Sequence, residues 1–501
     1  MSSAVSTPQA GHGPPAREAK SGQAGRRSPS GGKATTKAGG SGQVAEPGKR
    51  QEGQGFPPRR ILRRLANPLA MPVLALATAF LIGAAIIWIT SGSLTTVFEA
   101  YSGLVRGAFV KQRGFSETLV AMVPYVFLAL GVSVGFKAGL FNIGVEGQFY
   151  IGAISAAWVG QLTQGLPAVI HVPLAVAAGA LGGAIWAAIP GYLKARTGAH
   201  EVINTIMMNY IAFRLTEYLI SWPLKDKLAT AVQTQRVSPN AELWTLYGIR
   251  ERLQNPLDAL LVALVLAFSA WFLVHLWMRR RTPDEAGLSF FRRRSSIPWI
   301  TALAVGLISF LVLPLLARAW WPFGDPFGRL HVGLFMSVMA AFVVWWLLWQ
   351  TTIGFEMRTV GANPSAARYA GVRISRNIVL AMAISGALAG IAGTVEVLGV
   401  SICRCLPLFF SSGYGFDSIA IALLGKNNPF GILASAFLFG AMRNSADLME
   451  LTSGVSKYVI TIIQALVLLF VAAPSIVRWI YRMKPPAGAE QEAPLTRGWG
   501  G

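Results

Sequence analysis

Long apolar segments recur along almost the whole chain, and each is bounded by a short polar stretch. A helix needs about 20 consecutive, mostly apolar residues to cross a bilayer. About ten segments approach that length, and they cover residues 69–90, 117–136, 144–163, 168–193, 202–221, 257–278, 297–317, 332–350, 377–399 and 457–477. We therefore expect an all-α polytopic membrane protein with about ten transmembrane helices.

An eleventh apolar region, residues 416–447, is interrupted in its middle. Gly425 can end one helix, while Asn428 and Pro429 can cap and begin another. The first arm, about 416–425, is too short to span, so we expect a broken or re-entrant helical hairpin. Broken helices often line transport pathways, but a plain turn between helices at the cytoplasmic surface is an alternative.

A polar segment between two apolar ones, residues 361–371, predicts a short capped helix outside the membrane. Asn363 suits the N-cap, Pro364 suits the first helical position, and Gly371 can take the left-handed conformation that ends a helix. A helix over Pro364–Ala370 would be about two turns and roughly 10 Å long. Such a stub beneath a membrane bundle is suited to docking another protein.

Basic residues gather in loops that alternate along the predicted spans, and positive loops mark the cytoplasmic side. The groups are Arg59, Arg60, Arg63 and Arg64; Lys194 and Arg196; Arg279 to Arg281 and Arg292 to Arg294; Arg358, Arg368, Arg373 and Arg376; and Arg478, Arg482 and Lys484. Alternating spans place all of them inside. We therefore expect both termini, and the stub at 361–371, in the cytoplasm.

Composition supports a membrane protein and divides the chain into three parts. Of 501 residues, 53% are hydrophobic and 13% charged, whereas soluble domains carry about 25% charged residues. The net charge of +22 would suggest nucleic acid in a soluble protein, but cytoplasmic loops explain it here and no nucleic-acid partner is expected. Residues 1–57 are too polar to fold and predict a disordered basic tail. Residues 58–484 form the transmembrane domain, and 485–501 a short tail.

Polar side chains inside the predicted bundle are candidates for a translocation pathway, because intramembrane polar groups are costly and usually face a cavity or the bundle interior. They are Asn142, Glu146, Gln148, Asn204, Asn209, Glu396, Asp417 and Asn428. Two structural alternatives stay open. Glu146 could be a helix-end anchor paired with Lys137, and the polar residues of 201–217 could simply join helices. The spacings Gly179–Gly183 and Gly386–Gly390 predict close helix packing.

Motifs for chemistry are missing from the chain. Gly425-Lys426 is followed by Asn427, so it is not a phosphate-binding loop, and no metal-ligand spacing or nucleophile elbow occurs. We expect no enzyme activity, no metal and no cofactor on this chain.

A disulfide between Cys403 and Cys405 would be strained in an extended segment, so we interpret both as small apolar residues, with metal or redox chemistry as an alternative.

Four segments in one order, residues 139–148, 201–209, 361–371 and 413–431, resemble the permease subunits of ATP-binding-cassette (ABC) importers for nucleosides and simple sugars. This branch is related to the branched-chain amino acid permeases, and the resemblance covers about 60–480. It implies a type II importer-like fold in a bacterial inner membrane, with transport by alternating access. The stretch 257–317 departs from the pattern as a probable inserted hairpin.

The resemblance also implies partners. A cytoplasmic ATPase carrying ATP and magnesium would dock on the stub, a second homologous permease would complete the channel, and an extracytoplasmic binding lipoprotein would deliver substrate. The residues that would couple to the ATPase are Gly354, Arg358, Gly361, Asn363, Pro364, Ala366, Ala367 and Gly371. The alternative function is an ion-coupled secondary transporter that uses Glu146, Glu396 and Asp417.

Overall fold

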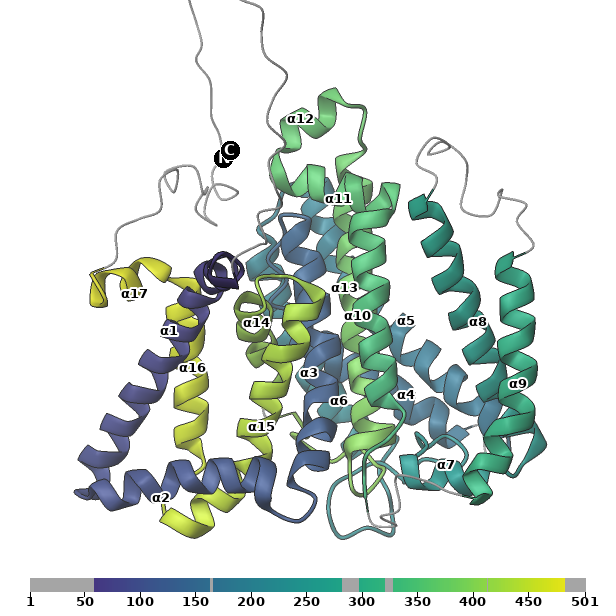
Figure 1. The fold of residues 1–501 in the computed structure, drawn as a ribbon, viewed down its shortest axis with the longest axis horizontal. Helices are drawn as coiled ribbons and strands as arrows, with labels where there is room; N and C mark the ends of the chain where they lie inside the picture. The colour runs from purple at the N-terminus through teal and green to yellow at the C-terminus, as the bar shows by residue number, and fades with distance from the viewer. Residues whose placement is uncertain (1–57, 163–164, 282–296, 320–327, 412, 483–501) are drawn as a thin grey trace, which may run out of the picture. The chain divides into compact units, whose positions relative to one another are not determined.

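A computed structural model describes residues 58–162, 165–281, 297–319, 328–411 and 413–482. The tail 1–57, the C-terminal residues 485–501 and Arg292 to Arg294 lie outside the described residues. The elements, in chain order (Figure 1), are α1 (Pro58–Ser91), α2 (Leu94–Val105), η1 (Arg106–Val110), α3 (Gly114–Lys137), α4 (Val145–Leu162), α5 (Ala168–Thr197), α6 (Glu201–Ser221), α7 (Leu246–Arg252), α8 (Pro256–Arg281), α9 (Ile297–Ala319), α10 (Gly333–Gln350), α11 (Thr352–Ala362), α12 (Pro364–Tyr369), α13 (Ile374–Val395), η3 (Glu396–Val400), α14 (Tyr414–Leu424), α15 (Pro429–Ser453), α16 (Tyr458–Ala472) and α17 (Pro474–Ile480).

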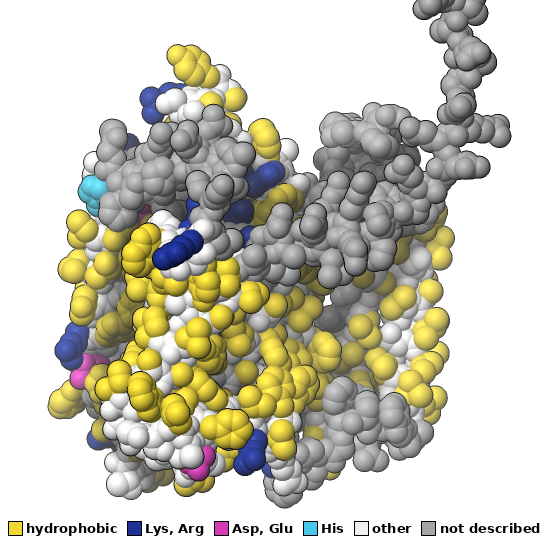
Figure 2. Space-filling model, turned by 60° about the vertical axis from the view of Figure 1, so that its left-hand side comes forward, with side chains coloured by type: hydrophobic (Ala, Val, Ile, Leu, Met, Phe, Trp, Pro, Cys, Tyr) yellow, Lys and Arg dark blue, Asp and Glu magenta, His cyan; other side chains and the backbone are white. Residues whose placement is uncertain are grey.

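The described chain is all-helical, as expected, apart from isolated β-bridges in its loops. Every predicted apolar segment contains a helix. In the described residues, however, only seven helices are long and apolar enough to cross a membrane, or up to eight if α16 and α17 count as one span. The predicted count of about ten spans is therefore reached only in part. Figure 2 shows apolar side chains over most of the described surface on its visible face.

The last predicted span, residues 457–477, is not one straight helix. Helix α16 ends at Ala472, and α17 begins at Pro474 with a bend of 92° between them. Proline has no N–H to continue the helical hydrogen bonds and its ring clashes with the preceding turn, which accounts for the break. Residues 94–110, to which the apolar pattern assigned no element, form α2 and the π-helical turn η1.

Helices α4, α5 and α13 pack through glycines at the centre of the bundle. A Cβ atom on Gly183 would lie 2.9 Å from Gly390 Cα, and one on Gly390 would lie 2.8 Å from the Gly179 carbonyl carbon. The same Gly390 backbone leaves no room for a Cβ on Gly152, which would come within 2.8 Å of its carbonyl carbon. The predicted close packing of these small residues is confirmed, and it joins α4 and α5 to α13.

Helices α8 and α9, the predicted inserted hairpin, pack mainly against each other, and α8 makes smaller contacts with α5 (Figure 1). This limited contact is compatible with an addition to a core that the other helices complete. That the hairpin is an insertion stays a prediction.

The broken hairpin at 416–447 is present as α14 and α15. Asn428 caps α15, because its side-chain oxygen accepts a hydrogen bond from Phe430 N at 3.0 Å. The reversal differs from the prediction in one detail: Gly425 keeps φ −73°, and the left-handed residues are Lys426 and Asn427, with φ 55° and 51°.

The interpretation of Cys403 and Cys405 was wrong, because the two form a disulfide with their Cα atoms 5.1 Å apart. The segment is not extended. Arg404 between them takes a left-handed conformation with φ 51°, which turns both sulfur atoms toward each other. The surrounding loop lies against the segment after α6: Thr234 N donates to Leu406 O at 3.0 Å. The disulfide therefore belongs to a folded loop that packs against the segment after α6.

Candidate functional site

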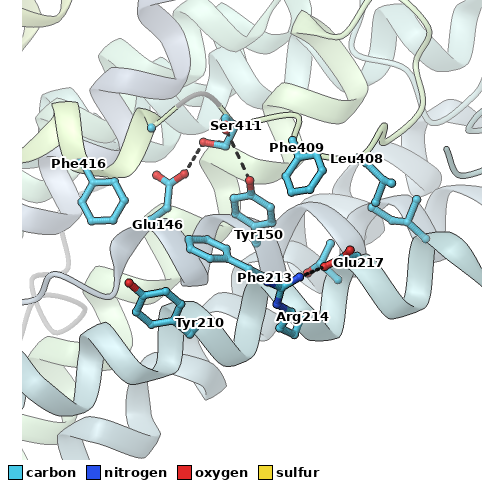
Figure 3. Close-up of a pocket in the computed structure, with 13 residues that line it drawn as sticks. Glu146, Tyr150, Tyr210, Phe213, Arg214, Glu217, Leu408, Phe409, Ser411 and Phe416 are labelled. Carbon is cyan, nitrogen blue, oxygen red and sulfur yellow. Dashed lines mark hydrogen bonds and ion pairs between the residues drawn. The ribbon is translucent and has the colours of Figure 1, made fainter. Parts of the chain in front are cut away.

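A cavity of about 370 Å³ lies between α4, α6 and the segment that leads into α14 (Figure 3). Five of its thirteen lining residues are aromatic, and the Glu146 carboxylate and the Ser411 hydroxyl lie together in its wall. The residues that line it are Glu146, Tyr150, Tyr210, Phe213, Arg214, Thr216, Glu217, Ile220, Leu408, Phe409, Ser411, Gly413 and Phe416. Of the predicted pathway residues, only Glu146 is among them.

Glu146 joins the beginnings of two helices. It stands in the first turn of α4, where its side chain is 2% exposed, and its carboxylate accepts hydrogen bonds from Ser411 Oγ and from Gly415 N in the first turn of α14. A Cβ on Gly415 would lie 2.6 Å from Glu146 Cα, so a glycine is required for this approach. The first N–H groups of a helix have no partner within the helix and favour negative charge.

The carboxylate of Glu146 therefore caps α14 from another helix. The N-cap residue Gly413 has no side chain to do so. The alternative pairing with Lys137 is not what the structure shows, because Lys137 Nζ lies 5.6 Å from the centroid of the Trp349 ring. Glu146 also forms part of the cavity wall. A ligand in the cavity thus meets the same carboxylate that holds α14.

The amides before and within α4 form a closed network. Asn142 Nδ2 donates to Gln148 Oε1 at 3.0 Å and to Ser385 Oγ at 2.9 Å, and Gln148 Nε2 donates back to Asn142 Oδ1 at 3.1 Å. Asn209 accepts from Gly147 N at 2.8 Å and donates to Ile143 O at 3.0 Å. These contacts fix the irregular backbone at the start of α4. A pathway role for these three amides stays a prediction.

Asn204 and Asn428 lie apart from the cavity wall. The amide nitrogen of Asn204 is buried without a hydrogen-bond partner, whereas Asn428 is exposed at the cap of α15. The structure gives Asn428 a local structural role. A place on the translocation pathway stays a prediction for both residues.

Asp417 and Glu396 lie in a second polar cluster. This cluster also contains Arg443, which was not among the predicted pathway residues. Tyr125 OH donates to Asp417 Oδ2 at 2.9 Å and accepts from Arg443 Nη1 at 3.2 Å. The Arg443 guanidinium carbon lies 3.8 Å from the centroid of the Tyr414 ring. Glu396 begins η3 and is buried, and its Oε2 has no hydrogen-bond partner.

Arg443 could have been found from its sequence context, because it is a lone cation in the long apolar stretch of α15, and intramembrane cations are usually paired and functional. Arg443 and Tyr125 tie α14 to α3 and α15. The cluster thus holds the first turns of α14 through Asp417, in addition to the cap that Glu146 makes at Gly415. Within the described residues, no group of three or more His, Cys, Asp or Glu side chains could hold a metal ion.

The predicted stub is present as α12, one residue shorter than expected. Asn363 caps it by accepting from Ala366 N at 3.0 Å, and Pro364 occupies the first turn. Gly371 follows with φ +78°. Helix α12 projects beyond the ends of its neighbours in Figure 1.

Ala367, predicted to couple to the ATPase, is buried within the chain itself, with 0% of its surface exposed. It does not form the outer surface of α12, and its part in coupling stays a prediction. Ala366 and Arg368 are exposed, and Tyr369 is 96% exposed. These three residues, with the capped helix beneath them, form the outer surface of the stub.

Helix α11 connects this stub to the transmembrane helices. Thr351 caps α11 by accepting from Gly354 N at 3.0 Å, and the Arg358 guanidinium carbon lies 6.0 Å from the Trp349 ring centroid. At the far end, the backbone of Gly361 crosses that of Gly139: a Cβ on Gly361 would lie 2.7 Å from Gly139 N. The end of α11 next to the stub is therefore in direct contact with the turn between α3 and α4, and Gly139 in that turn lies only seven residues before Glu146.

Comparison with known proteins identifies the chain's relatives. Residues 114–280 and 285–472 match the family described as the permease component of branched-chain amino acid transport systems. The chain belongs to this permease family. It is 33% identical to the guanosine ABC transporter permease protein NupP of Bacillus subtilis, over 86% of the chain and 100% of NupP.

Two other relatives cover most of the permease. It is 29% identical to the nucleoside ABC transporter permease protein NupB of Lactococcus lactis, over 85% of the chain and 96% of NupB. It is also 29% identical to the glucose ABC transporter permease protein TsgB13 of Haloferax volcanii, over 74% of the chain and 79% of TsgB13. No solved structure matches the chain significantly.

The chain is thus a multi-pass permease subunit of a bacterial ABC importer, as its motifs implied. Such a permease is not itself an ATPase and needs no cofactor of its own. Its transport is driven by a separate ATP-binding partner, and a binding protein supplies its substrate. This assignment favours ATP-driven import over the ion-coupled alternative.

The cap made by Glu146 generates a prediction about transport. In Glu146→Gln the single amide oxygen cannot reproduce both charged hydrogen bonds, and each such bond contributes about 1.5–3 kcal/mol. We expect initial uptake by vesicles containing the whole importer to fall about tenfold or more, while the amount of permease in the membrane stays near normal.

Glu217→Gln is the matched control, because Glu217 also lines the cavity but pairs with exposed Arg214 at 2.6 Å. It should transport nearly as well as the parent. Equal uptake by Glu146→Gln and the parent at low substrate concentration would show that the cap has no part in transport.

Proposed function

We propose that this permease imports nucleosides and that the cavity beside Glu146 forms part of their passage. The aromatic lining carries the proposal: Tyr150, Tyr210, Phe213, Phe409 and Phe416 surround a space with Glu146 and Ser411 at one side. Nucleobases stack on aromatic rings, whereas carboxylates and hydroxyls can bind ribose hydroxyl groups. The names of two relatives, NupP and NupB, support nucleosides. The glucose permease TsgB13 keeps simple sugars as the second candidate.

The geometry supports a route for coupling transport to ATP. A force on α12 would pass through α11 to the crossing of Gly361 and Gly139, and from there to the first turn of α4. Glu146 in that turn holds the start of α14. A movement of α4 would therefore change both the cavity wall and the position of the re-entrant helix, which is the kind of change that alternating access requires.

The proposal includes the orientation and the remaining partners. Basic residues near α12 and α17 support a cytoplasmic position for this end of the bundle, for both termini and for the docking ATPase. The cavity lies partly on α6, whose side chains Tyr210 and Tyr218 are exposed. A second homologous permease facing α6 would close it, and an extracytoplasmic binding lipoprotein would deliver substrate from the opposite end.

Substrate class can be tested with Phe213, whose ring lies in the cavity (Figure 3). Stacking on one aromatic residue contributes about 1–3 kcal/mol per base. For Phe213→Leu we expect the guanosine concentration that gives half-maximal uptake to rise about tenfold. The control is Phe98→Leu, because Phe98 lies on α2 and is 77% exposed. Its guanosine concentration for half-maximal uptake should equal that of the parent.

The measurement is uptake of labelled guanosine by vesicles containing the complete importer and its binding protein, with unlabelled ribose or glucose as competitors. Neither sugar should compete at concentrations where unlabelled guanosine does. Accumulation of glucose with no competition by guanosine would replace the nucleoside proposal with the sugar alternative.

Docking of the ATPase on α12 makes a separate prediction. Tyr369→Glu would place an unpaired charge in the contact, and burying such a charge costs several kcal/mol. We expect the ATPase to be lost when the permease is purified from membranes. Tyr458→Glu at the start of α16, 72% exposed, should retain it. Full retention of both the ATPase and uptake by Tyr369→Glu would remove α12 as the docking element.

A further inference from the structure

A second pocket lies at the end of the bundle that carries α12, away from the aromatic cavity. It has a volume of about 300 Å³ and is bounded by α1, the reversal between α14 and α15, and the bend between α16 and α17. Its lining is apolar except for two cations. The residues are Met71, Pro72, Leu423, Lys426, Phe470, Val471, Pro474 and Arg478. Nothing in the transport route described above uses this pocket.

The two cations come from the two irregular places in this part of the fold. Lys426 is exposed and sits at the tip of the broken hairpin, where its φ is 55°. Arg478 belongs to α17, which turns by 92° from α16. Pro474 begins α17 and also lines the pocket. Because of this bend, Arg478 lines the same pocket as Lys426 at the hairpin tip. A straight continuation of α16 would point elsewhere.

Helix α17 has the character of a helix that lies at a membrane surface. Val477 is 0% exposed and packs into the bundle, whereas Trp479 is 82% exposed. Tyr481 OH lies 3.1 Å from Thr78 Oγ1 and so fixes the end of α17 to α1. Tryptophan and tyrosine are enriched at the boundary between lipid and water. The pocket thus opens where lipid headgroups would lie.

We propose that this pocket binds the phosphate group of an anionic phospholipid. Lys426 and Arg478 supply positive charge for the phosphate, as basic pockets between transmembrane helices do for anionic headgroups. Met71, Leu423 and Phe470 supply apolar surface for the first part of the acyl chains. This apolar surface favours a lipid over free phosphate, because free phosphate has no acyl chain to pack against these side chains.

Such a lipid would contact three elements that line the pocket together. It would bridge the hairpin tip to α17 and α1. Because α14 also carries the Gly415 N–H that Glu146 caps, a bound lipid would steady the end of the same re-entrant helix whose beginning forms the transport site. The site is independent of which molecule the permease imports.

The test measures phospholipid retained by the purified importer complex in detergent, by native mass spectrometry, after equilibration with phosphatidylglycerol or phosphatidylcholine. Each basic residue near a membrane surface strengthens anionic lipid binding about fivefold. Lys426→Gln and Arg478→Gln should each lower phosphatidylglycerol retention by about that factor, and the double variant by more. Retention of phosphatidylcholine should not change.

Two sets of controls make the result specific. Lys457→Gln removes a charge near the other end of α16 and should retain phosphatidylglycerol as the parent does. Lys426→Arg and Arg478→Lys keep the charge and should also retain it, which separates loss of the site from misfolding. Parent-like retention of phosphatidylglycerol by the double variant would overturn the proposal. If free glycerol phosphate displaced phosphatidylglycerol as effectively as added phosphatidylglycerol does, the pocket would be an anion site without lipid specificity. That result would also overturn the proposal.

Discussion

The close backbone contact between glycines of α4, α5 and α13 is the constraint on which the rest of this structure depends. In a bilayer, lipid tails are as apolar as the helices, so helices associate through tight packing and polar contacts instead of a hydrophobic driving force. Gly152, Gly183 and Gly390 allow three helices to meet at distances that a single methyl group would prevent. The resulting core gives α4 a fixed position, and α4 carries Glu146.

Two segments of irregular backbone, before α4 and before α14, lie next to this core. The chain before α4 is held by the paired amides of Asn142 and Gln148, and the start of α14 is held by Glu146 and by the cluster around Arg443. Unpaired backbone groups at membrane depth are tolerated only inside protein or beside a water-filled cavity. The first of these conditions holds here, because the beginnings of α4 and α14 are buried in the protein where they meet at the wall of the aromatic cavity.

Local sequence signals predicted much of this fold, because they depend on neighbouring residues only. Apolar length marked the helices, and the Asn–Pro pairs at 363–364 and 428–429 marked two helix beginnings, each confirmed by its cap. Small-residue spacing marked the α5–α13 contact. The bend at Pro474 had a local signal as well, since a proline inside an apolar run can either end or merely kink a helix.

Other features arise from contacts between distant parts of the chain and left little trace in the sequence. The left-handed Arg404 that allows the Cys403–Cys405 disulfide depends on the loop that packs against it. The role of Glu146 depends on Gly415, far along the chain, and the burial of Ala367 accompanies the packing of α12 against α11 and α13. The aromatic cavity combines side chains of α4, α6 and the segment before α14, so no single motif contains it.

We propose that α12 transmits the action of the ATPase through α11 to the transport site, by way of the crossing of Gly361 and Gly139. The most direct test measures substrate uptake and ATP hydrolysis together in vesicles containing the whole importer with Gly361→Ala. A methyl group at this position would press on the backbone at Ala138 and Gly139. We expect the complex to assemble and hydrolyse ATP, with fewer molecules imported for each ATP. An unchanged ratio of uptake to hydrolysis would contradict this route of coupling.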